Sequence, residues 1–160
     1  MRKMFIIVLA GFSSLAYADV KPHKVAQISV DVPTGWKTQA PDENTMVIID
    51  SKEELKFRMM ILDEGDVQAS LKKANEKIQK AFQDVKCPAD LKPIKLNGMD
   101  AATQDCTASL GGTTVDLGLL LVRTPAKKIL MVLAVGEHAR VEARKAEITA
   151  FLLSIKPLAK

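Results

Sequence analysis

Two cysteines are the most informative reactive side chains in this sequence. Cys87 and Cys106 are the only cysteines among 160 residues. Their spacing is far from the C-x-x-C of thioredoxin-type redox sites, and two cysteines with two distant histidines do not supply a structural zinc site. In an exported protein an even pair usually forms a disulfide. We therefore predict a Cys87–Cys106 disulfide, with two free buried thiols as the alternative.

Copper binding is the metal chemistry that the remaining side chains suggest, because thioether and imidazole groups ligate Cu(I). The only histidines, His23 and His138, lie far apart in the sequence. The methionines show no ligand spacing, and the adjacent Met59 and Met60 would face opposite sides of a strand. We interpret the methionines as core residues and predict no metal site and no cofactor. The methionines concerned are Met46, Met59, Met60, Met99 and Met131.

No catalytic constellation stands out. A nucleophile needs a neighbouring base, and the sequence has no G-x-S-x-G motif. The carboxylate pairs Glu53-Glu54 and Asp63-Glu64 lie in predicted turns, where charged residues are the ordinary surface choice. We expect both histidines to be solvated. The sequence therefore favours a non-enzymatic binding or accessory module that presents a face or groove to a protein or small apolar ligand. The alternative is an enzyme with an unrecognised site.

Two features are candidate partner surfaces. The first predicted helix carries Lys72, Lys73, Lys77 and Lys80, which we interpret as a solvated face; a weak contact with an anionic partner or lipid headgroup is the alternative. Trp36 is the only tryptophan, and it is either a core residue over the end of the sheet or an exposed anchor for a partner. We favour the core position and expect a largely buried indole.

Small residues mark a third feature, in the predicted strand over 100–109. They predict either a shallow groove or a close approach by a helix. The residues concerned are Ala101, Ala102, Thr103, Thr107 and Ala108.

The amino terminus has the order of a secretory signal. Arg2 and Lys3 precede an apolar run of about a dozen residues, too short to span a bilayer, and Ala16-Tyr17-Ala18 follows. We predict a signal peptide over 1–18, cleaved between Ala18 and Asp19, a flexible lead-in over 19–25, and a single domain over 26–160 in the periplasm or outside the cell. Cleavage removes two positive charges from the formal net charge of +4, so nothing indicates a nucleic-acid partner. No transmembrane segment is expected.

Hydrophobic periodicity predicts the remaining elements. Alternating or continuous apolar patterns indicate seven strands, and gaps of three and four indicate two helices, over 66–86 and 138–155. The doubly apolar stretches 117–122 and 129–135 should lie in the middle of a sheet. The strands over 27–32 and 55–62 should lie nearer the edges or on a half-exposed face. We predict the α+β class: a mainly antiparallel sheet with one helix on each face, in the order βββ-α-ββββ-α. The seven strands are expected over 27–32, 45–49, 55–62, 94–96, 100–109, 113–124 and 128–135.

This order of elements resembles the PsbP-like superfamily of exported proteins. The resemblance rests on a strand leading into Val32-Pro33-Thr34-Gly35-Trp36, a charged turn before the third strand, the Asn97-Gly98 turn, the long paired strands that end at 130–135, and a closing helix with Ser154-Ile155-Lys156. It covers nearly the whole chain after residue 18. It implies an α/β/α sandwich and an accessory, non-enzymatic role, and it carries over no catalytic residue.

Overall fold

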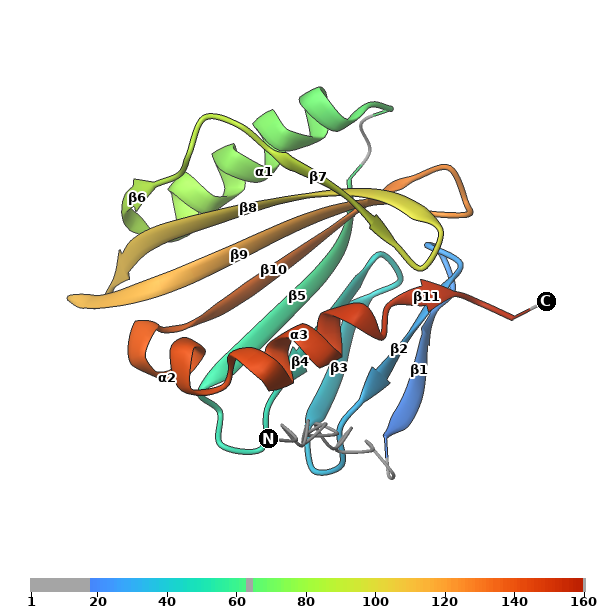
Figure 1. The fold of residues 1–160 in the computed structure, drawn as a ribbon, viewed down its shortest axis with the longest axis horizontal. Coiled ribbons are helices and arrows are strands. Elements are labelled where there is room, and N and C mark those ends of the chain that lie inside the picture. The colour runs from blue at the N-terminus through green and yellow to red at the C-terminus, as the bar shows by residue number, and fades with distance from the viewer. Residues whose placement is uncertain (1–17, 63–64, 160) are drawn as a thin grey trace, which may run out of the picture.

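The computed structural model describes residues 18–62 and 65–159. Their main feature is an eight-stranded sheet in which every pairing is antiparallel (Figure 1). In spatial order its strands are β3 (Lys37–Asp42), β4 (Thr45–Ile49), β5 (Leu55–Leu62), β10 (Ile129–Glu137), β9 (Thr113–Arg123), β8 (Met99–Leu110) and β6 (Gln83–Lys86), and β7 (Lys92–Leu96) also pairs with β8. A smaller sheet contains β1 (Asp19–His23), β2 (Ile28–Val32) and β11 (Lys156–Pro157).

Helices cover both faces of the large sheet. In Figure 1, α1 (Val67–Ala81) lies on one face, while α2 (His138–Ala143) and α3 (Lys145–Leu153) lie on the other. The predicted α+β sandwich with a mainly antiparallel sheet is therefore confirmed. None of the helices in the described part of the chain has the length and apolar character needed to cross a membrane.

The central strands bury side chains on both faces. In β9, Leu117 and Leu119 belong to the hydrophobic cluster under α1, and Leu120 and Val122 belong to the cluster under α3. The predicted central position of the doubly apolar strands β9 and β10 is confirmed. Of the two positions predicted for β5, the sheet edge is wrong, because this strand lies between β4 and β10. One face of β5 is nevertheless incompletely buried, at Lys56, Arg58 and Met60.

The first helix ends earlier than its apolar spacing predicts. It was expected to reach residue 86, but α1 ends at Ala81, Phe82 has extended backbone angles, and residues 83–86 form β6. Val85 still packs against the cluster under α1, which explains why its spacing suited a longer helix. Pairing of β6 with the edge of β8 supplies the backbone hydrogen bonds that a continued helix would have made.

The predicted flexible lead-in was also wrong. Residues 19–23 form β1, which pairs with β2 along its whole length. His23 is 3% exposed: its Nε2 lies 3.1 Å from the carbonyl oxygen of Asn44, and its Nδ1 accepts from the Ala26 amide. The expectation that this histidine is solvated is therefore corrected, because both ring nitrogens have partners inside the fold. The predicted signal peptide, apart from Ala18, lies outside the described residues.

Two short helices replace the single closing helix that was predicted. The break falls at Arg144, where φ is −119° and ψ is 18°. After α3, residues 156–157 pair with β2 as β11. The Asn97-Gly98 turn forms as predicted, with positive φ at both residues, and the Asn97 amide donates to the carbonyls of Leu153 and Ile155 at 2.7 Å. The turn therefore fixes the end of α3.

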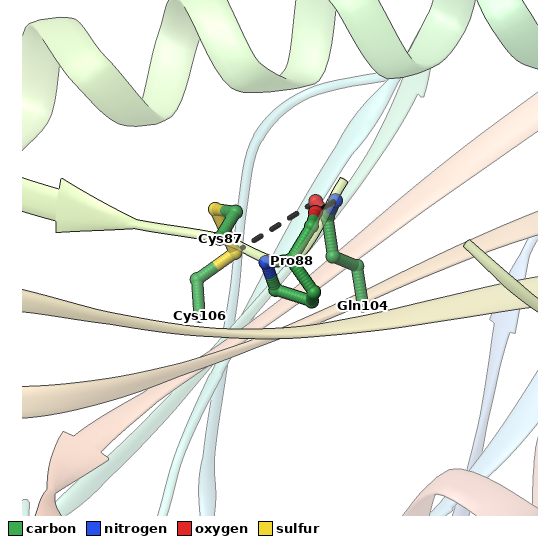
Figure 2. Close-up of a disulfide and its surroundings, with 4 residues drawn as sticks. All are labelled: Cys87, Pro88, Gln104 and Cys106. Atoms are coloured by element: carbon green, nitrogen blue, oxygen red, sulfur yellow. Dashed lines mark hydrogen bonds between the residues drawn. A yellow bond between two sulfur atoms is a disulfide. The ribbon is translucent and has the colours of Figure 1, made fainter. Parts of the chain in front are cut away.

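The predicted disulfide joins Cys87 and Cys106, whose Cα atoms are 4.3 Å apart. Cys106 lies in β8 as expected, but Cys87 follows β6 rather than a helix end. Figure 2 shows the bond beside Gln104, whose Nε2 donates to the Pro88 carbonyl at 2.6 Å. The disulfide and this hydrogen bond hold the segment between β6 and β7 against the edge of β8.

We predict that a Cys87→Ser, Cys106→Ser variant folds but melts on the order of 10 °C lower, because the cysteines are 19 residues apart and closing such a loop contributes roughly 3 kcal/mol. Circular dichroism during heating, with and without dithiothreitol, measures the change. Reductant should lower the wild-type melting temperature and leave the variant unaffected. Equal melting temperatures for variant and oxidised wild type would contradict the prediction.

Candidate functional site

A groove opens between the α2–α3 pair and the face of β8, β9 and β10 beneath it. Its volume is about 370 Å³. We call it the α3 groove. Its apolar lining includes Phe57, Gly118, Ala134, Val141, Ile148 and Leu152, and its polar lining includes Asp105, Thr107, Asp116, Glu142, Lys145 and Thr149. Thr107 lies in the stretch whose small residues predicted either a shallow groove or close helix packing.

Small side chains on the central strands create the space. Gly118 and Ala134 are register partners on β9 and β10, and a Cβ at Gly118 would lie 3.6 Å from the Ala134 Cβ, an ordinary contact distance. At the end of β10, a Cβ at Gly136 would lie 2.8 Å from Leu55 Cδ2 and 2.9 Å from Val141 Cγ2. Gly136 thus lets α2 approach the sheet closely, while residues 118 and 134 leave room beneath α3.

The polar side of the groove is mainly acidic. Asp105 and Glu142 form no ion pair with any residue in the described ranges, and neither does Lys145. Asp116 pairs with His138 at the edge of the groove, with Oδ2 2.9 Å from Nδ1. Three carboxylates therefore face one ammonium group, so the field at the opening favours positively charged groups.

A buried carboxylate organises the loop that supports the helix pair. Asp50 is 0% exposed. Its Oδ1 accepts from the amides of Glu54 and Leu55, each at 2.7 Å, and Oδ2 accepts from the Lys52 amide at 3.2 Å. Burial opposes ionisation of Asp50, but hydrogen bonds from backbone amides and Arg144, with the charge of Arg144, give a net lowering of its pKa.

Arg144 connects this loop to the junction of α2 and α3. Its Nη1 donates to Asp50 Oδ2, while Nε and Nη2 donate to the two carboxylate oxygens of Glu147 at 2.8 and 3.0 Å. The hydrogen bonds to Glu147 raise the pKa of Arg144 more than burial lowers it. The hydrogen bond to Asp50 adds to the rise, so the guanidinium stays charged. Its Cζ lies 5.9 Å from the centroid of the Trp36 ring, within cation–π range.

Trp36 completes an aromatic cluster beneath the helix pair. Its ring stacks on Phe57 with a centroid distance of 5.7 Å and lies 5.4 Å from the Phe151 ring. The side chain is half-buried and packs against the cluster under α3. These contacts agree with the core position favoured for Trp36, although the indole is less buried than expected.

The second candidate surface, formed by the lysines of α1, lies on the opposite face of the large sheet. Lys72, Lys77 and Lys80 are exposed on α1 and Lys73 is half-buried, whereas Trp36 belongs to the opposite face. The structure therefore does not join these residues into one surface.

The enzymatic alternative would need a reactive group beside a base. His138 is exposed, as expected, and pairs with Asp116 through Nδ1. No hydroxyl or thiol among the described residues forms a hydrogen bond with its ring, and those residues contain no cluster of three or more metal-ligating side chains. Within the described residues, His138 therefore has a carboxylate partner but no nucleophile hydrogen-bonded to its ring.

The important residues that the sequence did not single out are Asp50, Arg144 and the groove carboxylates. Asp50 lies in the charged turn before the third predicted strand, and Arg144 lies inside the single closing helix predicted over 138–155. The two are 94 positions apart, so no local pattern joins them.

Comparison with known proteins identifies the fold. Protein-family models and curated proteins gave no match. Among solved structures, PsbP from Synechocystis sp. PCC 6803 superposes with a TM-score of 0.65. The alignment covers 91% of this chain and 95% of the PsbP chain, at 10% sequence identity. The Ran-binding protein Mog1p of Saccharomyces cerevisiae matches 89% and 97%, with a TM-score of 0.59 and 11% identity.

A third match is LpqN of Mycobacterium tuberculosis, a protein involved in cell envelope biogenesis. It covers 81% of this chain and 82% of its own, with a TM-score of 0.55 and 12% identity. The chain therefore has the PsbP-like fold, as its sequence pattern indicated.

We predict that Arg144→Met lowers the free energy of unfolding by about 3–5 kcal/mol at neutral pH, because it leaves the buried Asp50 carboxylate without its cation. The lowered pKa of Asp50 means that ionised Asp50 stabilises the fold above the carboxyl range. This contribution is lost as the pH falls through the native pKa, so the difference from wild type should shrink below about pH 4. Urea unfolding at several pH values measures it.

Arg140→Met is the matched control. Arg140 pairs with Glu54 at 3.4 Å through a side chain that is 57% exposed, and such surface pairs contribute less than about 1 kcal/mol. An Arg144→Met variant no less stable than this control would show that the buried pair does not hold the helix junction.

Proposed function

We propose that this chain is an exported, non-enzymatic binding module, and that its α3 groove holds a single-chain apolar molecule with a positively charged end. The observation that carries the proposal is the combination, in one groove, of an apolar lining from both helix and sheet with a mainly acidic opening. Apolar walls supply binding free energy by removing ligand surface from water, and the few polar groups set its orientation.

The size of the groove suits a small ligand. Its volume of about 370 Å³ lies within the usual range for ligand pockets of roughly 300–1,000 Å³. Asp105 and Glu142, which have no ion-pair partner among the described residues, would approach a cationic group and would repel an anionic one. The α3 groove should therefore bind cationic ligands and exclude anionic ones.

The comparisons support a binding role at the level of fold. One protein of this fold is Ran-binding, and another is involved in cell envelope biogenesis. Because one fold hosts many functions, the ligand class proposed here depends on the groove and not on these relatives.

Export is supported by the sequence signal and by the disulfide, a bond that persists in oxidising compartments. We predict that secreted or periplasmic material begins at Asp19, which intact-protein mass spectrometry measures. Cleavage after Ala18 leaves β1 whole, because this strand begins at Asp19. Exported protein that retains residues 1–18 would contradict the proposal.

We predict that decyltrimethylammonium binds the oxidised protein and that Ala134→Leu weakens binding about tenfold or more, because the larger side chain fills the groove floor. Isothermal titration calorimetry below the micelle concentration measures the affinity. Ala146→Leu is the matched control: residue 146 is exposed on α3 and does not line the groove.

The charge preference has its own test. Asp105→Asn with Glu142→Gln should weaken decyltrimethylammonium binding and leave the uncharged analogue decanol unaffected. If decyltrimethylammonium binds wild type, Ala134→Leu and Ala146→Leu with equal affinity, the α3 groove is not its binding site.

A further inference from the structure

A second cleft lies on the opposite face of the sheet, between α1 and strands β5 and β10. Its volume is about 240 Å³. We call it the α1 cleft. Its apolar lining includes Met60, Ile78, Phe82, Met131 and Leu133, and its charged lining is Arg58 and Lys77.

The cleft exists because α1 covers only part of this face. The main contacts of α1 are with β6, β9 and β10, so the neighbouring strip of β5 borders the helix without lying under it. Side chains alternate along β5, and Arg58 and Met60 lie on the α1 side. The edge of the helix and the exposed part of the strand thus form two walls of one cleft.

Both cations of the cleft lack a partner among the described residues. Neither Arg58 nor Lys77 forms an ion pair or side-chain hydrogen bond there. The register neighbours of Arg58 are Val47 and Leu133, so no carboxylate stands opposite it on the sheet. Two cations from different elements therefore border the same apolar space.

This arrangement is complementary to one class of ligand. A carboxylate would lie between the guanidinium and the ammonium group, since charge-assisted hydrogen bonds are the strong ones. An attached alkyl chain would lie against Met60, Met131 and Phe82. Methionine side chains adapt to flexible apolar ligands because they are unbranched and polarizable.

We propose that the α1 cleft binds a single-chain carboxylate of the fatty-acid type, with Arg58 and Lys77 holding the carboxylate. This site is separate from the α3 groove in position and opposite in charge, so its test does not depend on the function proposed above. It also gives a specific role to the region around Lys77, one of the helix lysines, in place of a general basic face.

Decanoate, below its micelle concentration, is the probe. Isothermal titration calorimetry should show binding to the oxidised protein, and Arg58→Gln with Lys77→Gln should weaken it about tenfold or more, because two charge-assisted contacts are lost. The matched control is Lys72→Gln with Lys80→Gln, which removes the same charge from exposed positions of α1 outside the cleft. This control should change the affinity less than about twofold.

A second readout locates the ligand. Decanoate should shift the methyl NMR signals of Met60 and Met131, acetate should not, and Ala134→Leu should leave decanoate binding intact. If the cleft variant (Arg58→Gln with Lys77→Gln) and the control variant (Lys72→Gln with Lys80→Gln) lose the same affinity for decanoate, the effect is one of overall charge and the proposal is overturned. Loss in Ala134→Leu would place the carboxylate in the α3 groove and overturn it equally, as would binding to anionic vesicles without saturable decanoate binding.

Discussion

The Asp50–Arg144 pair is the contact on which the α3 side of the molecule depends. It joins the loop before β5 to the junction of α2 and α3, which lies 94 positions further along the chain. Removing two charges from water is costly. A buried ion pair is therefore tolerated only where the other hydrogen-bonding atoms of the carboxylate and the guanidinium also have partners. Here three backbone amides and Glu147 meet it. The pair therefore fixes where the helices lie, and with that the width of the α3 groove.

The two faces of the sheet differ in how they are closed. On the α3 side, aromatic contacts among Trp36, Phe57 and Phe151 fill the space beside the ion pair, and small residues leave the groove open further along. On the α1 side, the amphipathic helix α1 covers β9 and β10, and no helix in the described part of the chain lies over the margin at β5. Carboxylates border the first opening and cations the second. One sheet thus carries two recesses of opposite electrostatic character.

The sequence predicted those elements whose conformation depends on nearby residues. The doubly apolar strands β9 and β10, the Asn97-Gly98 turn and the start of α1 at Asp66 all followed from periodicity or turn chemistry. The strands that were missed, β1, β3, β6 and β11, are short and polar and owe their conformation to pairing with a neighbour. The groove was only suggested, because its floor comes from Gly118 and Ala134 on strands other than the one that was rich in small residues.

The shared fold constrains the buried faces of the sheet more than its margins. Proteins that are about 10–13% identical to this chain keep its architecture, which requires only that both faces of the sheet be buried by apolar side chains in the right alternation. A helix is narrower than the sheet that it covers, so each face has margins where burial is incomplete. Residues at those margins are free of the folding constraint, and their charges can differ between proteins of one fold. In this chain the margins hold Asp105 and Glu142 on one side and Arg58 and Lys77 on the other, and specificity should be sought there.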